Sequence, residues 1–513
     1  MSGRLDTSTP SRSTELLLGI DIGTGSTKAV LVNPHGELIA SATRAHAMAM
    51  PRPGWAEMDA ESIWWGDVVA LCGELLPQVG MGRITGVCVS GLGPCLLLCD
   101  QEGRPLRPAI LYGIDMRAVS EIAELTERYG ADEIVRRGGT ALSTQAVGPK
   151  MLWVQRHEPE VWSAARRWYN SNSFIAGRLT GEYVLDHHTA SQCVPLYEIK
   201  QNTWVDDWTA DLAGALERPR LVWPHEVIGR VTAQAASETG LPLGTPVSAG
   251  TVDAWSEAFS VGVRRPGDLM MMYGSTMFLV QVLSELRSDP LLWTTVGVEP
   301  GTYTFAAGTS TAGSLTNWLQ QLVGNVPFSD LVPEAALVPA GSDGLIVLPF
   351  FQGERTPIYD PQARGVIAGL TLRHQRGHIV RAVYEGIAYG LRAILESLDE
   401  AGGAATRIVA VGGGTKGDLW TQIVTDVLNR DQQIPAQTIG ASYGDALLAA
   451  IGTGLLPPET DWAVPGHLLS PNPSNRDVYD SMYEIYRSLY PASLEQVHRL
   501  AVIQEESAAG SGT

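Results

Sequence analysis

Residues 16–43 read LLLGIDIGTGSTKAVLVNPHGELIASAT. The apolar run at the start ends at a carboxylate, Asp21, which is followed by a turn rich in Gly and hydroxyl residues and then by a second apolar run. Residues 33–36 carry the residue types of another turn. The pattern predicts a β-hairpin, with Gly23 and Gly25 in its turn, and a further strand after it.

A second segment repeats this arrangement. Residues 268–283 read DLMMMYGSTMFLVQVL, in which the tripeptide GST at 274–276 separates two apolar runs. The similarity of the two hairpins predicts two similar halves of the chain, because internal repetition marks a duplicated unit. A predicted buried strand at 246–250 and a predicted helix after Asp253 precede the second hairpin, so we place the boundary between the halves near residue 256.

Strand and helix patterns alternate along most of the 513 residues, which predicts an α/β fold. Residues 378–395 place apolar side chains four positions apart, and this spacing marks one face of a helix. Residues 408–428 predict a strand, a triple glycine and a helix, and residues 475–500 predict a terminal helix.

The composition limits the classes of function. The chain has 36 Lys and Arg against 55 Asp and Glu, for a net charge of -19, which argues against nucleic acid or an anionic membrane surface as a partner. No apolar run approaches the ~20 residues that span a bilayer, and the polar N-terminus lacks the apolar core of a signal peptide. The five cysteines lack metal-site spacing and predict reduced thiols. We therefore expect a cytoplasmic protein.

The first hairpin has residues that suit phosphate and metal binding. In DIGTGSTK (21–28), small residues after the carboxylate allow backbone N–H groups to approach a phosphate closely, and Asp21 can hold a hydrated Mg²⁺ beside it. A plain hairpin turn accounts for the same residues. The P-loop pattern GxxxxGK[ST] is absent from the sequence, which disfavours a Walker-type ATPase.

Two later positions have both a functional and a structural interpretation. The glycines at 412–414 follow a predicted strand, where a bare backbone lets a flat ligand such as adenine approach, but a tight strand-to-helix turn uses the same residues. Asp253 lies where a strand ends and a helix begins. It can serve there as a general base or as a carboxylate beside a metal, and it can equally cap the helix.

Taken together, these residues resemble the FGGY carbohydrate kinases, from about residue 16 to about residue 455. The resemblance rests on an ordered series of motifs, which are DIGTGSTK, WAEMD (55–59), SAGTVD (248–253), YGSTM (273–277), AGSLTNW (312–318), FQGERTP (351–357) and VGGGTKGDLW (411–420). The segments KMLWVQRHEPE (150–160) and GERTP are similar to the xylulokinase-like subgroup.

The resemblance implies a fold of the actin and hexokinase type, with two ribonuclease H-like α/β domains and a nucleotide cleft between them. We expect these domains at residues 15–256 and 257–500, with disordered tails at 1–14 and 501–513. The resemblance also implies ATP and Mg²⁺ as cofactors, with Asp21 and Asp253 at the metal, and a homodimer by analogy. It makes Asp253 the catalytic base. The residues that it places around the nucleotide are Asp21, Gly23, Thr24, Gly25, Ser26, Lys28, Gly274, Ser275, Thr276, Gly313, Asn317, Gly413, Gly414 and Lys416.

The acceptor side departs from the xylulokinase pattern. Those enzymes carry a Met-His pair where this chain has Pro94 and Cys95, and an Asn after the catalytic Asp where this chain has Ala254. Both changes remove groups that hydrogen-bond a polyol, and such losses alter specificity strongly. Cys95 either touches the substrate or fills space beside the pocket. The residues that the resemblance places at the acceptor are Gly93, Pro94, Cys95, Asp115, Arg117, Asp253 and Ala254.

The expected activity is transfer of the γ-phosphoryl group of ATP to a hydroxyl of a small sugar, with a ketopentose such as D-xylulose as acceptor. Erythritol, glycerol, ribulose or a quorum signal remain alternative acceptors, and a non-catalytic ATP-binding sensor of the same fold remains open. The sugar-kinase motifs disfavour an actin-like polymer or an Hsp70-like ATPase. ATP turnover that depends on an added sugar distinguishes a kinase from these alternatives.

Overall fold

The computed structural model describes residues 15–79 and 83–510, so the tail expected at residues 1–14 lies outside the described part of the chain. The fold is mixed α/β, as the alternating pattern predicts. The chain folds as two compact units, of which unit 1 comprises Met1–Gly262, Val298–Pro300 and Ile439–Trp462, and unit 2 comprises Val263–Gly297, Gly301–Thr438 and Ala463–Thr513.

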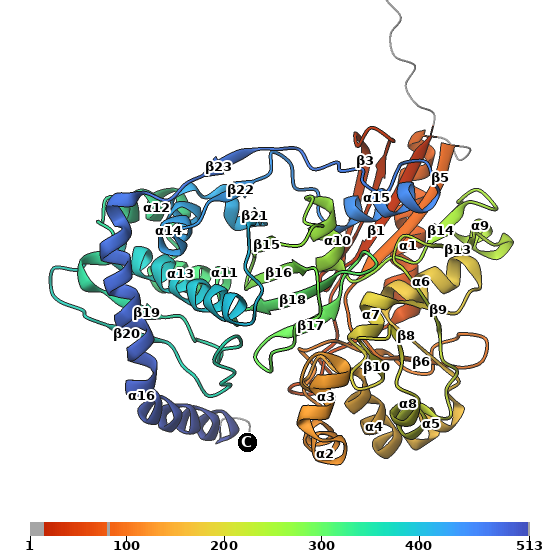
Figure 1. Cartoon of the computed structure of the whole chain (residues 1–513), viewed down its shortest axis with the longest axis horizontal. Coiled ribbons are helices and arrows are strands. Elements are labelled where there is room, and N and C mark those ends of the chain that lie inside the picture. The colour runs from red at the N-terminus through yellow and green to blue at the C-terminus, as the bar shows by residue number, and fades with distance from the viewer. Residues whose placement is uncertain (1–14, 80–82, 511–513) are drawn as a thin grey trace, which may run out of the picture. The chain divides into compact units, whose positions relative to one another are not determined.

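Unit 1 is built on a six-stranded sheet (Figure 1). The predicted hairpin and its following strand form an antiparallel meander, and the first strand of that meander also pairs in parallel with a later strand. In spatial order the strands are β13 (Val227–Arg230), β14 (Pro246–Ser248), β5 (Ile84–Gly91), β1 (Leu16–Ile22), β2 (Ser26–Val32) and β3 (Leu38–Ala45).

Strand β1 is apolar on both faces because both faces of the sheet are covered. Leu16, Leu18 and Ile20 belong to one buried cluster, whereas Leu17 belongs to another that includes α15 (Ala441–Gly452). Helix α15 approaches β1 at Gly19, where a Cβ atom would lie 1.8 Å from the carbonyl oxygen of Ser442. The glycine is therefore required by this close approach.

Unit 1 differs in two ways from the domain expected at residues 15–256. Its first segment continues to Gly262, six residues beyond the expected boundary, and it also includes Ile439–Trp462, the segment that contains α15 and that we expected in the second domain. Residue 256 falls inside α10 (Asp253–Ser260), and α10 packs on α15. A Cβ on Gly444 would lie 2.0 Å from the carbonyl oxygen of Ser256. Because α10 and α15 pack this closely, both belong to the same unit.

The remaining elements of unit 1 are helices around the sheet and short paired strands. The helices are η1 (Ala60–Trp65), α1 (Gly66–Val79), α2 (Val119–Tyr129), α3 (Ala131–Gly138), α4 (Val147–His157), α5 (Pro159–Ala164), α6 (Ser171–Thr180), α7 (His187–Ser191), α8 (Asp206–Ala213) and α9 (Ala233–Thr239). The paired strands are β4 (Glu57–Met58) with β7 (Ala109–Ile110), β6 (Leu97–Cys99) with β8 (Arg167–Tyr169), β9 (Val184–Asp186) with β12 (Arg220–Val222), and β10 (Tyr197–Glu198) with β11 (Thr203–Trp204).

Unit 2 repeats the sheet topology of unit 1, which confirms the two similar halves. Its hairpin continues into an antiparallel meander, and the first hairpin strand pairs in parallel with a later strand. In spatial order the strands are β17 (Trp293–Val296), β18 (Tyr303–Gly308), β16 (Met277–Leu283), β15 (Asp268–Tyr273), β21 (Arg407–Val411), β22 (Gln432–Ile434) and β23 (His467–Leu469). A separate pair consists of β19 (Ile346–Leu348) and β20 (Val366–Ala368).

The helices of unit 2 include the two that the sequence predicts at 378–395 and in the terminal segment. The first of these is α13, and its four-residue apolar spacing is buried at Val383, Ile387, Leu391 and Leu395. The α-helices are α11 (Gly313–Leu322), α12 (Phe328–Ala336), α13 (Arg376–Glu400), α14 (Asp418–Leu428) and α16 (Arg476–Gly510), and the 3-10 helices are η3 (Ser342–Gly344), η4 (Gly413–Lys416) and η5 (Pro473–Asn475).

Helix α16 corrects the expected C-terminal tail, since it continues to Gly510 and not only to residue 500. Buried Val497 and Ala501 hold this last part against unit 2. The helix changes direction in Figure 1, and Pro491 inside it accounts for the bend because proline removes a helical hydrogen bond. Among the residues that the structure describes, no helix is long and apolar enough to cross a bilayer.

Candidate active site

Asp21 lies near the end of β1, in the centre of the unit 1 sheet. It pairs with Lys28 across the hairpin and with Ser90 of β5 on its other side. The Oγ atom of Ser90 lies 3.4 Å from Oδ1 of Asp21. The Lys28 ammonium donates a hydrogen bond to the carbonyl oxygen of Ile439. The sheet register therefore holds a carboxylate and an ammonium group side by side at the end of the first hairpin.

The environment of Asp21 disfavours its ionised form. Burial raises the pKa of Asp21 to about 6, and the Ser90 hydroxyl and the Lys28 charge offset only part of this effect. Burial also lowers the pKa of Lys28, while the negative charges of Asp21 and Glu257 raise it. A carboxylate in this state is ready to receive a cation, because a cation restores the stability of the charged form.

Asp253 is the first residue of α10. The preceding residue, Val252, occupies the N-cap position, and the Asp253 carboxylate accepts a hydrogen bond of 2.7 Å from the main-chain N–H of Ala254. Asp253 thus satisfies an N–H group of the first turn, so its structural interpretation holds beside the functional one. A bridge between Gly91 and Val252 places this start of α10 beside the end of β5. Burial raises the pKa of Asp253 well above its usual value, and the negative charge of Asp21 raises it further. The structure thus brings Asp21 and Asp253 together.

Glu257 is a member of this cluster that the sequence motifs do not reveal. It lies one helical turn after Asp253 on α10, and its pKa rises to about 7 because of burial and the charge of Asp21. Lys28 partly opposes this rise. The sequence could have indicated Glu257 by its spacing from Asp253, since residues four apart lie on one face of a helix.

A second unpredicted carboxyl, Asp445 of α15, lies behind the site. Its Oδ2 atom is 2.6 Å from Ser90 Oγ, and its Oδ1 atom accepts a hydrogen bond of 2.7 Å from Ser256. Burial raises the pKa of Asp445 well above its usual value. Ser90 thus connects Asp445 to Asp21, and Ser256 connects it to α10. The sequence could have indicated Asp445, because it is the single acidic residue in the segment ASYGDALLAA, whose other residues are apolar or small.

The turn of the first hairpin is held from the side by His46. Its Nε2 atom lies 3.0 Å from the carbonyl oxygen of Gly23, and its main-chain N–H donates to the carbonyl oxygen of Gly25. Thr24 Oγ1 lies 2.8 Å from the Tyr112 hydroxyl. These contacts fix the backbone of the turn while Gly25 stays exposed.

Asp115 and Arg117 form a buried ion pair in unit 1. The Arg117 guanidinium donates to both carboxylate oxygens of Asp115 and to Oε1 of Glu57, and neither side chain of the pair is exposed. The guanidinium also lies 4.2 Å from the centre of the Trp55 ring. Since these contacts occupy both groups, the pair supports the loop 113–117, and direct contact with an acceptor stays a prediction.

Pro94 follows a cis peptide bond with Gly93, and the next residue, Cys95, is fully buried. The main-chain N–H of Cys95 donates to Asn170, and burial raises the pKa of its thiol to about 12. This geometry agrees with the interpretation of Cys95 as a space-filling residue. Lys150 of α4 is also buried, and within residues 15–79 and 83–510 its ammonium has no hydrogen-bond acceptor. Burial lowers the pKa of Lys150 to about 8.

In unit 2, the second hairpin turn is joined to the start of α11. The main-chain N–H groups of Ala312 and Ser314 donate to the carbonyl oxygen of Ser275, and that of Gly313 donates to Gly274. A Cβ on Gly313 would lie 2.5 Å from the Gly274 carbonyl oxygen, so only glycine permits this contact. Helix α11 also carries Asn317, and Thr276 closes the turn by accepting from Gly274.

The triple glycine lies beside the same turn, because β15 and β21 are parallel neighbours that end together. Gly412 has a φ of 93°, and a Cβ there would lie 2.7 Å from the carbonyl oxygen of Tyr273. Gly413 has no atoms near its Cβ position, and Lys416 is exposed. Unit 2 therefore gathers its predicted nucleotide residues around the ends of two adjacent strands.

The carboxylates of Asp21 and Asp253 in unit 1 suit a magnesium ion that also binds the phosphate groups of a ligand. Within the described residues, no three His, Cys, Asp or Glu side chains come together as a complete metal site. Mg²⁺ usually takes one or two carboxylates and completes its shell with water and substrate phosphates. The raised pKa values of Asp21 and Asp253 indicate negative charge that lacks compensation, which such a cation supplies.

The chain matches two family models along most of its length. Residues 16–260 match the N-terminal domain of the FGGY family of carbohydrate kinases, and residues 269–453 match the C-terminal domain of that family.

Related proteins and structures agree with these matches. The chain is 30% identical to a xylulose kinase of Staphylococcus epidermidis over 93% of this chain and 96% of the relative. It is 26% identical to a gluconokinase of Bacillus subtilis over 86% of this chain and 88% of that protein. A crystal structure of xylulose kinase from Rhodospirillum rubrum is similar with a TM-score of 0.88 and 35% identity, and the match covers 94% of this chain and 100% of that one.

Proposed function

The chain belongs to the FGGY family of carbohydrate kinases and is an ATP-dependent sugar kinase, and we propose that its acceptor is a ketopentose, D-xylulose. The names of the similar proteins support this acceptor, as does the xylulokinase-like GERTP segment. Pro94, Cys95 and Ala254 are then tolerated changes around the same acceptor. Cys95 stands where the xylulokinases carry the His of the Met-His pair, and its side chain is fully buried. We infer that this change alters the packing beside the acceptor and adds no hydrogen bond to it.

We propose Asp253 as the general base, and its position beside Asp21 is the observation that carries the assignment. A sugar hydroxyl is a poor nucleophile until its proton is removed. The Asp253 carboxylate takes this proton as the hydroxyl oxygen forms its bond to the γ-phosphorus, and the bond from that phosphorus to ADP breaks. A raised pKa suits the role, because a base works best when its pKa lies near the working pH.

The nucleotide contacts are proposed for both hairpins. The turn residues Gly23, Thr24, Gly25 and Ser26 and the ammonium of Lys28 face phosphate groups from unit 1, where backbone N–H groups and a positive charge balance phosphate charge. The turn residues Gly274, Ser275 and Thr276 do the same from unit 2. Gly313 and Asn317 line the nucleotide, and Gly413, Gly414 and Lys416 border the adenosine.

Asp21 and Asp253 are the proposed ligands of Mg²⁺. When bound, the ion neutralises charge on the phosphate oxygens and orients the transferred group. Asp21 holds its position through Ser90, which Asp445 orients from behind. Burial keeps the pKa of Asp253 high, and the negative charges of Asp21 and then of Glu257 add to this effect.

A coupled assay of ADP release tests the acceptor and the base together. We expect the highest kcat/KM with D-xylulose, against D-ribulose, gluconate, glycerol and erythritol at equal concentrations. Asp253→Asn should lower kcat by about 10²- to 10⁴-fold, because the amide cannot accept the proton. ATP binding should stay nearly unchanged, because Asp21 still holds Mg²⁺ and the two hairpins still contact the nucleotide. A preference for another compound overturns the acceptor, and near-normal turnover of the variant overturns the base.

A further inference from the structure

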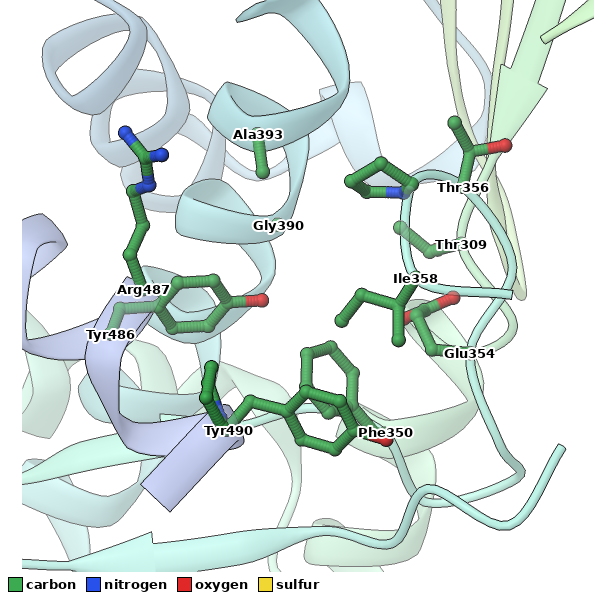
Figure 2. Close-up of a pocket in the computed structure, with 12 residues that line it drawn as sticks. Thr309, Phe350, Glu354, Thr356, Ile358, Gly390, Ala393, Tyr486, Arg487 and Tyr490 are labelled. Carbon is green, nitrogen blue, oxygen red and sulfur yellow. The ribbon is translucent and has the colours of Figure 1, made fainter. Parts of the chain in front are cut away.

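Unit 2 contains a cavity of about 210 Å³ that none of the predicted site residues lines (Figure 2). Its walls come from the FQGERTP segment, the middle of α13 and the part of α16 that precedes the bend at Pro491. Most of the lining is apolar, with the rings of Phe350, Tyr486 and Tyr490 and the side chain of Ile358 around the open space. The cavity is therefore formed by elements that have no assigned role in phosphoryl transfer.

A buried carboxyl group, that of Glu354, lines this apolar space. Glu354 is 6% exposed, and its Oε1 atom accepts hydrogen bonds of 2.7 Å from the main-chain N–H groups of both Ser310 and Arg355. In the described part of the chain, both of these main-chain donors reach Oε1, and the side chain of Ser310 also stabilises the ionised carboxyl group. Burial raises the pKa of Glu354 to about 7, so the apolar surroundings hold back its ionisation.

The aromatic rings suit a positive charge next to this carboxyl group. Phe350 meets Tyr490 edge-on at 5.2 Å and lies 6.2 Å from Tyr486 between ring centres. Faces of aromatic rings attract cations, and this attraction is strongest where water is excluded. The Tyr486 hydroxyl is directed across the cavity toward Ile358 and has no hydrogen bond within residues 15–79 and 83–510. It is thus free to accept a hydrogen bond from a ligand.

Of the two arginines near the cavity, Arg355 acts on Glu354, because its positive charge lowers the pKa of that carboxyl group. Arg487 lines the cavity with its aliphatic part, and its guanidinium is directed away from the open space in Figure 2. The Arg487 side chain is 67% exposed, and its Nη1 atom lies 3.8 Å from Oε2 of Glu396. The guanidinium of Arg355 donates to the carbonyl oxygen of Thr309. Arg355 therefore offsets only part of the effect of burial on Glu354, whose pKa still rises to about 7.

The size of the cavity limits the ligand to a single ring or a branched chain of similar volume. An apolar cavity of about 150 Å³ is enough to bind benzene, so 210 Å³ accommodates one ring with a short substituent. We propose that this cavity is a second ligand site, which takes a small hydrophobic amine whose ammonium group pairs with Glu354 and whose apolar body lies among Phe350, Tyr486 and Tyr490.

Three probes with the same ring and different charge test this proposal: benzylamine, benzyl alcohol and benzoate. Their binding to the full chain is measured by calorimetry and by ligand-observed NMR near neutral pH, which requires no kinase activity. We expect benzylamine to bind with a Kd about tenfold below that of benzyl alcohol, because charge-assisted hydrogen bonds are stronger than neutral ones. Benzoate should not bind. Equal affinity for benzylamine and benzyl alcohol overturns the proposed ligand class.

Glu354→Gln is the decisive variant, since its amide oxygen can accept the same two main-chain hydrogen bonds while the charge is removed. The Kd for benzylamine should rise about tenfold to that of benzyl alcohol, whose own Kd should change by less than about twofold. Ala393→Phe, which fills the cavity from α13, should abolish binding of both compounds. Tyr486→Phe keeps the ring and removes the hydroxyl that accepts from the ligand, so it should weaken benzylamine binding less than Glu354→Gln does. Unchanged benzylamine binding in Glu354→Gln or in Ala393→Phe overturns the site.

Discussion

Replacement of Asp21 by Asn should make the ligand-free protein more stable while it impairs catalysis. The ionised carboxylate costs the folded state free energy, since burial raises the pKa of Asp21 from 3.8 to about 6. One pKa unit corresponds to about 1.36 kcal/mol, so this difference is worth about 3 kcal/mol when the group is fully ionised in both states. Asparagine has a similar shape and carries no charge to be stabilised.

The pH dependence gives the sign of this effect. The folded state holds the proton of Asp21 more tightly than the unfolded state, so the stability linked to this group is fully present below pH 3.8 and is lost as the pH rises through about 6. The gain in the free energy of unfolding for Asp21→Asn is therefore expected to be about 3 kcal/mol at pH 8 and roughly half of that at pH 5.

Urea unfolding of the ligand-free protein and the variant at both pH values measures this difference. Glu133→Gln is a control of opposite sign, because hydrogen bonds from Arg136 lower the pKa of Glu133 to about 2, and its removal should reduce stability at pH 8. The variant Asp21→Asn should also need more Mg²⁺ for ATP use. An Asp21→Asn protein that is no more stable than the parent at pH 8 would refute the inference that burial destabilises the ionised Asp21 carboxylate.

Three further substitutions test other parts of the site. Gly313→Ala should raise the KM for ATP about tenfold, because its Cβ would lie 2.5 Å from the Gly274 carbonyl oxygen, whereas Gly73→Ala, which has open space around its Cβ, should leave the KM unchanged. Asp115→Asn should lower the free energy of unfolding by about 1 to 3 kcal/mol, since the buried Arg117 charge loses one of its two carboxylate partners and keeps Glu57; a loss below about 1 kcal/mol in urea unfolding would contradict a structural role for the pair. Glu257→Gln should move the acid limb of the kcat/KM profile to lower pH, because loss of a negative charge lowers the pKa of Asp253, which must be ionised to act as base; a limb that stays in place would separate Glu257 from the base.

The local features of this protein follow from short stretches of sequence. The hairpin turns at 23–25 and 274–276, the paired α/β halves and the long helix α13 depend on apolar periodicity and on small residues at turns, both of which act between near neighbours in the chain. The motifs that identify the carbohydrate kinases are also local, since each is a short segment that can be read without knowledge of the tertiary structure.

The sequence by itself therefore determined the fold class, the two hairpins and the positions of Asp21 and Asp253, whereas only the tertiary structure decided what surrounds them. The return of α15 to unit 1, the placement of Asp445 behind Ser90 and the burial of the Asp115–Arg117 pair depend on packing between segments far apart in the chain. The pKa values of Asp21 and Asp253 depend on the same packing, because desolvation and the approach of like charges arise only after the chain has folded.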